Sequence, residues 1–127
     1  MSASVVMEFI ARINRHDVQG IIEMMSHDHI FVDGLGNRMD HGRMKSGWPA
    51  YFELFPDYKI EVDAIAADGD TILVSGKAMA SYKGSGKAED SWMIPAAWKA
   101  LVRGKSISHW QVYCDSAAPL AILAKKE

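Results

Sequence analysis

Residues 50–62 read AYFELFPDYKIEV, and the apolar pattern changes its period within this segment. Phe52 and Phe55 lie three positions apart, which is the spacing of one face of a helix. Ile60 and Val62 alternate with charged residues, which is typical of a strand with one buried face. The segment therefore predicts helices on its N-terminal side and strands on its C-terminal side.

The N-terminal part of the chain predicts three helices and one short strand. Residues 4–14 repeat apolar side chains every three or four positions, and Asp17 is placed to cap a second, shorter helix. Residues 30–33 predict a short strand that ends before two glycines. A third helix lies within residues 42–55, where Pro49 either starts the main helix or kinks a longer one.

Turn signals divide the C-terminal part into strands. Asp68-Gly69-Asp70 is typical of a hairpin turn, and Pro119 can open a short final helix. The predicted elements are strands over residues 71–82, 91–103 and 106–115, and a helix over residues 118–124. Helices on one side of an antiparallel sheet make an α+β fold, and a curved sheet with helices across its concave face leaves a cone-shaped cavity.

Composition limits the classes of function. A chain of 127 residues is expected to form a single domain, residues 1–127. Fourteen basic against sixteen acidic residues give a net charge of -2, so we expect no nucleic-acid partner. No apolar run reaches the ~18 residues of a membrane span. Cys114 is the one cysteine, which excludes a disulfide within the chain and predicts a cytoplasmic location.

Three segments resemble a known superfamily. They are FIARINRHDVQGIIEMMSHDHIFVDGLG (residues 9–36), AYFELFPDYKIEV, and GKSISHWQVYCD (residues 104–115). With the order of the elements they are similar to the nuclear-transport-factor-two-like superfamily, and most to its SnoaL-like polyketide cyclase and ketosteroid isomerase branch. The likeness covers residues 4–115. It implies a cystatin-like roll, a cone-shaped curved antiparallel sheet with three helices on its concave side, and a homodimer formed through the outer face of the sheet.

The resemblance places a candidate general base at Asp33. Ketosteroid isomerases carry their proton-shuttling aspartate at the end of the first short strand, and FVDGLGNRMDHG (residues 31–42) puts Asp33 there. A carboxylate withdrawn from water suits proton abstraction. Asp before Gly is also typical of a turn, so a purely structural role for Asp33 stays open.

The chain departs from the related enzymes at other catalytic positions. The tyrosine of the ketosteroid isomerase oxyanion hole matches Phe9, and its protonated acid falls near Ala97 or Trp98. A replacement donor could come from the Trp98 or Trp110 indole or from a tyrosine on the third helix. The sequence of the last strand, WQVYCD, also resembles that of limonene epoxide hydrolases. Their catalytic aspartate and arginine, however, match Val112 and Gln111.

Two histidines are further candidates. His29 has the same strand parity as Asp33 and could act as its proton partner. His27 and His29 have the spacing of two metal ligands on a strand, but no convincing third and fourth ligands follow, so we expect no metal. His109 alternates with Trp110 on the last strand and is expected to face outward. A one-residue bulge would turn it inward as a catalytic candidate, and both registers stay open.

These observations lead to one hypothesis and one alternative. The chain is expected to bind a small, hydrophobic, cyclic, carbonyl-bearing molecule, with Asp33 as general base for proton transfer, isomerisation or cyclisation. The alternative is a non-catalytic ligand-binding or interaction module of the same fold. No motif indicates a cofactor. The expected lining of the cavity is apolar or aromatic: Phe9, Phe31, Trp48, Phe52, Phe55, Trp98, Trp110, Val112 and Cys114.

Overall fold

The computed structural model describes residues 1–126 and contains four α-helices and six strands in that range. The helices are α1 (Ser2–Asn14), α2 (Val18–Met24), α3 (His41–Leu54) and α4 (Ala117–Lys125). The strands are β1 (Met25–Val32), β2 (Arg38–Asp40), β3 (Lys59–Asp68), β4 (Thr71–Ser81), β5 (Ser91–Arg103) and β6 (Ser106–Cys114). Two short 3₁₀ turns, η1 (Tyr82–Gly84) and η2 (Ala88–Asp90), connect β4 to β5.

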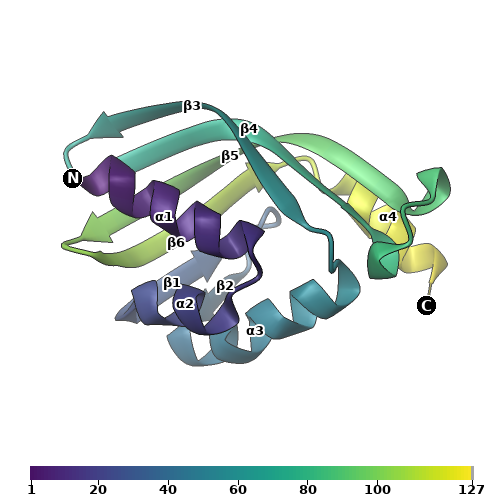
Figure 1. Cartoon of the computed structure of the whole chain (residues 1–127), viewed down its shortest axis with the longest axis horizontal. Coiled ribbons are helices and arrows are strands. Elements are labelled where there is room, and N and C mark those ends of the chain that lie inside the picture. The colour runs from purple at the N-terminus through teal and green to yellow at the C-terminus, as the bar shows by residue number, and fades with distance from the viewer. Residues whose placement is uncertain (127) are drawn as a thin grey trace.

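The six strands form one sheet in the order β2-β1-β6-β5-β4-β3, which curves over the helices (Figure 1). Most neighbouring strands are antiparallel, but β1 and β6 pair in parallel. The prediction of an antiparallel sheet is therefore wrong at this one pair. A parallel pair needs a long connection, and here residues 33–105, more than half of the chain, run between the two strands.

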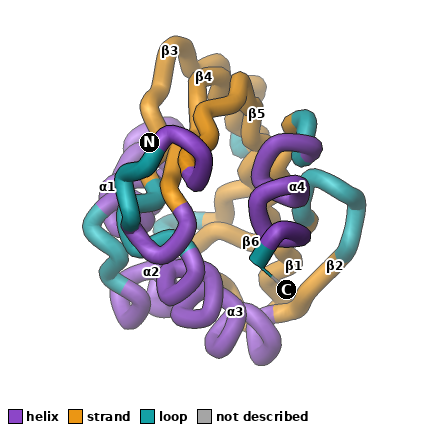
Figure 2. Tube along the Cα trace, turned by 90° about the vertical axis from the view of Figure 1, so that its right-hand side faces the viewer, coloured by secondary structure: helices purple, strands orange, loops and turns teal. Residues whose placement is uncertain are grey.

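Three helices lie on the concave side of the sheet, as predicted, and α4 lies at the end near β5 and β6 (Figures 1 and 2). The Asp17 carboxylate accepts a hydrogen bond from Gly20 N (3.0 Å) and caps α2, as predicted. Asp40 caps α3 in the same way, and Pro49 lies inside that helix rather than at its start. The α+β roll predicted from the sequence is confirmed, and the final helix predicted over residues 118–124 is α4. No helix within residues 1–126 is long and apolar enough to cross a bilayer.

The register of β6 places Trp110 on the inner face of the sheet. Val102 pairs with Ile107, but Leu101 pairs with His109, so β6 holds one extra residue at Ser108. This bulge comes before His109. It therefore leaves Trp110 buried on the inner face and His109 on the outer face.

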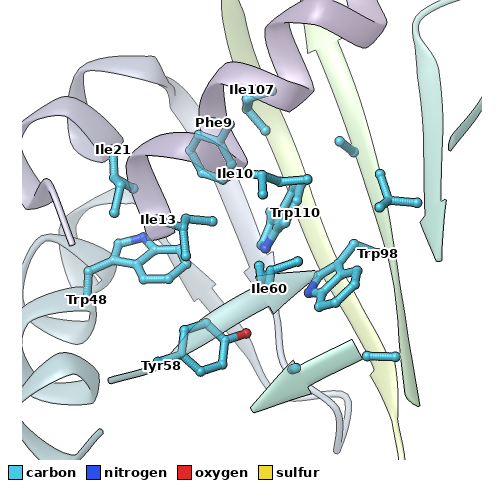
Figure 3. Close-up of a cluster of buried hydrophobic side chains, with 14 of the residues drawn as sticks. Phe9, Ile10, Ile13, Ile21, Trp48, Tyr58, Ile60, Trp98, Ile107 and Trp110 are labelled. Atoms are coloured by element: carbon cyan, nitrogen blue, oxygen red, sulfur yellow. The ribbon is translucent and has the colours of Figure 1, made fainter. Parts of the chain in front are cut away.

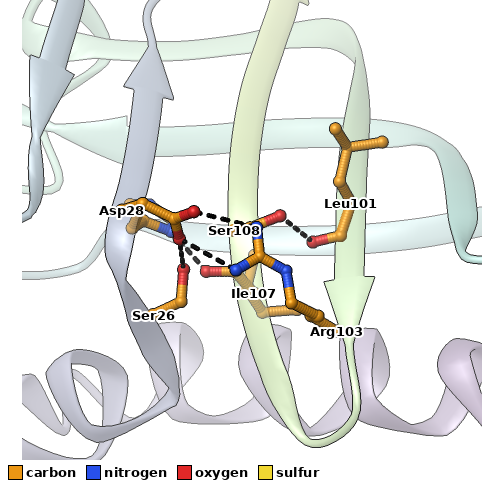
Figure 4. A network of polar contacts seen from close by, with 7 residues as sticks. Ser26, Asp28, Leu101, Arg103, Ile107 and Ser108 are labelled. Carbon is orange, nitrogen blue, oxygen red and sulfur yellow. Dashed lines mark hydrogen bonds and ion pairs between the residues drawn. The ribbon is translucent and has the colours of Figure 1, made fainter.

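A polar network joins β1 to the β5–β6 hairpin (Figure 4). Arg103 Nη2 lies 2.9 Å from Asp28 Oδ2, and the Ser26 hydroxyl donates to Asp28 Oδ1 at 2.7 Å. Both side chains of the ion pair are more than half exposed, so we expect it to add little to the stability.

The core between helices and sheet is strongly aromatic (Figure 3). The Phe9 ring contacts Trp110 edge-on, with 5.0 Å between centroids, and also approaches Trp48 at 6.4 Å. Trp98 stacks against Trp110 on the neighbouring strand at 6.5 Å. These large side chains are buried in the core, and Trp48 and Trp110 also border an open space toward α3 and the end of β1.

Candidate functional site

A cavity of about 370 Å³ lies between α3 and the sheet. Small-molecule sites in proteins usually measure about 300–1,000 Å³, so this volume suits a small ligand. The helix contributes Met44, Trp48, Tyr51 and Leu54 to the walls. The remaining walls include Phe31, Ile60, Trp110 and Val112 from the sheet, with Asp33, Met39 and Tyr58 at the ends of strands.

Local sequence explains how these side chains reach the cavity. Met44, Trp48 and Tyr51 repeat at intervals of four and three, so they share one face of α3. Trp110 and Val112 are two apart on β6 and point to the same side of the sheet.

Asp33 lies at the cavity and in a turn at the same time. Its Oδ1 accepts hydrogen bonds from the backbone N–H groups of Leu35 and Asn37, both at 2.9 Å. Its Oδ2 accepts from the Asn37 side-chain amide at 3.1 Å. Both roles considered for Asp33 in the sequence are thus compatible with its position. These three hydrogen bonds fix the carboxylate in the turn and leave Oδ2 with one donor from within residues 1–126.

His29 lies on the same face of the sheet as Asp33 but deeper, packed near the Phe9 ring at 6.5 Å. Its Nδ1 donates to the carbonyl oxygen of Ile107 at 2.6 Å, which assigns the proton to that nitrogen. Burial lowers the pKa of His29, and the bond to Ile107 opposes this only in part. The ring is therefore neutral at neutral pH, and it is not part of the cavity wall.

His109 lies on the outer side of the sheet. Its Nε2 is 3.0 Å from Oε1 of Gln111, and neither residue belongs to the cavity wall. The structure therefore does not bring Asp33, His29 and His109 together.

The expected lining residues fall into two groups. Four of them line the cavity, namely Phe31, Trp48, Trp110 and Val112. Phe9, Phe52, Phe55 and Trp98 are buried in the core instead, and Cys114 is half-buried with its Sγ 3.5 Å from Ser116 Oγ. The core positions have specific partners. Phe52 stacks on His16 at 4.0 Å, and Phe55 meets Trp92 edge-on at 5.5 Å.

Two tyrosines belong to the cavity wall: Tyr51 is the tyrosine of the third helix that the sequence offers as a replacement donor, whereas the sequence interpretation missed Tyr58. Tyr51 lies three residues after Trp48, so the helical spacing could have placed it on the same face. Tyr58 is positioned by the turn after α3, where its N–H donates to the carbonyl of Phe55 at 3.0 Å. Burial raises the pKa of both phenols, so both hydroxyls keep their protons at neutral pH.

A second, wider groove lies between α2, β1 and the β5–β6 hairpin. Polar and apolar side chains line it, and two of its charged residues, Asp28 and Arg103, pair with one another. The His27 and His41 rings lie 6.4 Å apart at its edge. Within residues 1–126, no three His, Cys, Asp or Glu side chains are arranged to hold a metal ion.

Comparisons with known proteins agree on the fold. The family model described as the SnoaL-like domain matches residues 6–109. No curated protein matches the chain.

Solved structures are similar over nearly the whole length. AclR from Streptomyces galilaeus, described as a candidate hydroxylase, is 19% identical with a TM-score of 0.79, covering 98% of this chain and 96% of its own. IdmH, a candidate polyketide cyclase from Streptomyces antibioticus, is 18% identical with a TM-score of 0.79 and coverage of 98% and 99%. A candidate SnoaL-like polyketide cyclase from Shewanella denitrificans is 13% identical with a TM-score of 0.82 and coverage of 98% and 97%.

Proposed function

Because the chain belongs to the SnoaL-like domain family, we propose that it binds a small, apolar, ring-containing ketone in the cavity beside α3. One observation carries this proposal: the cavity has apolar and aromatic walls, with a single carboxylate, Asp33, among its lining residues. Such a site excludes strongly hydrated ligands and favours flat, apolar ones.

Asp33 is the acid–base group that we assign to this site. A proton on the carbon beside a carbonyl would pass to Asp33 Oδ2, which accepts one hydrogen bond from within residues 1–126. The C–H bond breaks, its electron pair forms the enolate, and negative charge moves to the carbonyl oxygen. The enolate then takes a proton back elsewhere or forms a carbon–carbon bond. The candidate polyketide cyclases among the similar structures are named for a ring closure of this general class.

A non-catalytic binding module is the second candidate. It is favoured by the three hydrogen bonds on Asp33 and by the distance of both histidines from the cavity. Binding is common to both candidates. The deuterium-exchange experiment in the Discussion separates them.

The binding proposal predicts that 2-tetralone, a two-ring ketone, binds saturably to the chain, as measured by isothermal titration calorimetry. Val112→Phe adds volume inside the cavity and is expected to weaken binding at least about tenfold, since a filled cavity leaves less apolar surface to bury. Met93→Phe is the matched control, because Met93 is exposed on β5 and outside the cavity. Absence of binding to the wild-type chain, or unchanged binding to Val112→Phe, would disprove the proposal.

We propose further that two copies of the chain associate through the outer face of the sheet. Leu73, Leu101 and Tyr113 expose between a third and a half of their surface there, on three neighbouring strands. Covering such a patch is favourable, and a two-fold dimer is the commonest way to do so.

The dimer predicts a species of twice 14.1 kDa in sedimentation velocity at micromolar concentration. Leu73→Glu buries a charge in that interface and should give monomers. Leu120→Glu, on exposed α4 surface, should not. A wild-type chain that sediments only as a 14.1 kDa monomer would contradict the dimer.

A further inference from the structure

Two tyrosines from different elements meet at the cavity. Tyr51 comes from α3, and Tyr58 comes from the segment between α3 and β3. Their rings pack edge-on with 5.1 Å between centroids. Tyr58 is only 9% exposed, and its hydroxyl points to the side of the core where Ile60 and Trp98 lie (Figure 3).

Neither hydroxyl donates a hydrogen bond to a protein atom within residues 1–126, although both residues line the cavity. Neither oxygen is among the fully buried polar atoms without a partner in these residues, so both hydroxyls are open to the space of the cavity. Water can accept from them in the free protein, and an acceptor oxygen of a ligand can take its place.

The protonation of both groups agrees with a donor role. Burial raises the pKa of Tyr58 well above its ordinary value and also raises that of Tyr51. Cys114 opposes ionisation of both phenols and Tyr51 opposes that of Tyr58, which adds to the effect of burial on the pKa of each tyrosine. Both tyrosines are thus O–H donors across the neutral pH range.

The balance of donors and acceptors in the cavity is uneven. Asp33 is the charged acceptor of the wall, and three donors of its own turn already bind it. The Trp110 indole nitrogen also points toward Ile60, another residue of the wall (Figure 3). The cavity therefore matches a ligand that brings acceptor oxygens, and it suits amines and other donor groups poorly.

We propose that the hydroxyls of Tyr51 and Tyr58 form a donor pair that binds a carbonyl or enolate oxygen of the ligand, an inference that rests on the proposed function. The pair lies in the cavity wall, whereas Phe9, the position at which the related isomerases carry their tyrosine, is buried in the core. It defines the substrate class as ketones, quinones and enols. During proton abstraction the same two donors would meet the negative charge that develops on oxygen.

The test compares two probes with the same ring skeleton, 2-tetralone and tetralin, of which only the ketone has an oxygen. Binding is measured by calorimetry for the wild-type chain, Tyr51→Phe, Tyr58→Phe and the double variant. Each single change is expected to weaken ketone binding about three- to tenfold, the usual worth of one hydrogen bond. Tetralin binding should stay unchanged or improve. Tyr82→Phe is the matched control, because Tyr82 lies outside the cavity wall.

An infrared measurement reports the contact directly. The carbonyl stretch of bound 2-tetralone should fall to lower frequency in the wild-type protein and return toward its value in apolar solvent in the double variant. Thermal unfolding and near-ultraviolet circular dichroism check that the variants keep the wild-type packing.

The outcomes separate the two proposals. If the wild-type chain binds both probes and the double variant binds the ketone equally well, the donor pair is wrong and the cavity proposal stands. If neither probe binds the wild-type chain, both proposals are wrong. Selective loss of the ketone in the tyrosine variants, with loss of the infrared shift, supports the pair.

Discussion

The wild-type protein is expected to isomerise a β,γ-unsaturated ketosteroid about a thousandfold more slowly than an enzyme with a complete oxyanion hole. Donors aimed at the developing oxyanion are usually worth a hundred- to a thousandfold each. Here the tyrosine position is Phe9, which is fully buried in the core, and the acid position falls at Ala97 or Trp98. Loss of both donors should cost on the order of 4 kcal/mol even with strong non-additivity.

The remaining groups do not replace those donors for a steroid. A general base contributes about 10²–10⁴-fold in total, which is less than the two missing donors supply together. Tyr51 and Tyr58 line the cavity, whereas Phe9 lies in the core, so donors at these tyrosines would meet a ligand placed differently from a steroid bound in the isomerase manner. A cavity of about 370 Å³ is also near the lower end of small-molecule sites, which favours ligands smaller than four fused rings.

The measurement is a steady-state assay at the absorbance of the conjugated ketone. Phe9→Tyr restores the matching residue type and is the informative variant. Phe9 packs against Trp48 and Trp110 but is not itself part of the cavity wall. We therefore expect no gain in kcat/KM from Phe9→Tyr. Turnover by the wild-type chain near the diffusional ceiling would contradict the prediction, and strong rescue by Phe9→Tyr would show that this position reaches the substrate.

Asp33→Asn is expected to remove the catalytic proton transfer. The readout is deuterium exchange at the carbon beside the carbonyl of 2-tetralone in D₂O, followed by proton NMR. We expect the wild-type chain to accelerate this exchange over buffer and Asp33→Asn to be slower by about 10²–10⁴-fold. The amide cannot take up a proton at neutral pH, but it retains nearly the same shape.

The fold should survive this change. The Asn oxygen can still accept from the backbone of Leu35 and Asn37, whereas its amide faces the Asn37 amide, so one hydrogen bond is lost. This costs about 1 kcal/mol of unfolding free energy. Asn37→Ala is the matched control, since it removes the same hydrogen bond and keeps the carboxylate, and it should retain exchange activity.

Two outcomes would count against Asp33 as the base. Exchange by Asp33→Asn at the wild-type rate would leave Asp33 with only its turn role. Exchange by the wild-type chain no faster than buffer, in the presence of confirmed ketone binding, would identify the non-catalytic binding module.

Much of the fold is visible in the sequence because its signals are local. The change of period in residues 50–62 separates α3 from β3, and the Asp17 cap marks the start of α2. The alternation along GKSISHWQVYCD divides β6 into two sets, and the register implied by the resemblance places Trp110 and Val112 inward, where they line the cavity. In each case a few neighbouring residues contain the physical cause, namely a hydrogen bond to the next turn or a side-chain period that matches the backbone.

The make-up of the cavity depends on contacts between distant segments, which a single sequence does not contain. Local spacing marks Trp48 and Phe52 alike as apolar helix positions, yet packing places Trp48 at the cavity and Phe52 against His16. His29 is a second case. Its place in the strand pattern is compatible with a position at the cavity rim, and only the structure shows that its ring donates to the carbonyl oxygen of Ile107. The sequence by itself determined the α+β roll, because periodicity and caps are local, and its resemblance to the family placed Asp33 at the end of the first strand. Only the tertiary structure decided that Tyr51 and Tyr58 meet at the cavity, because their meeting depends on how α3 packs against the sheet.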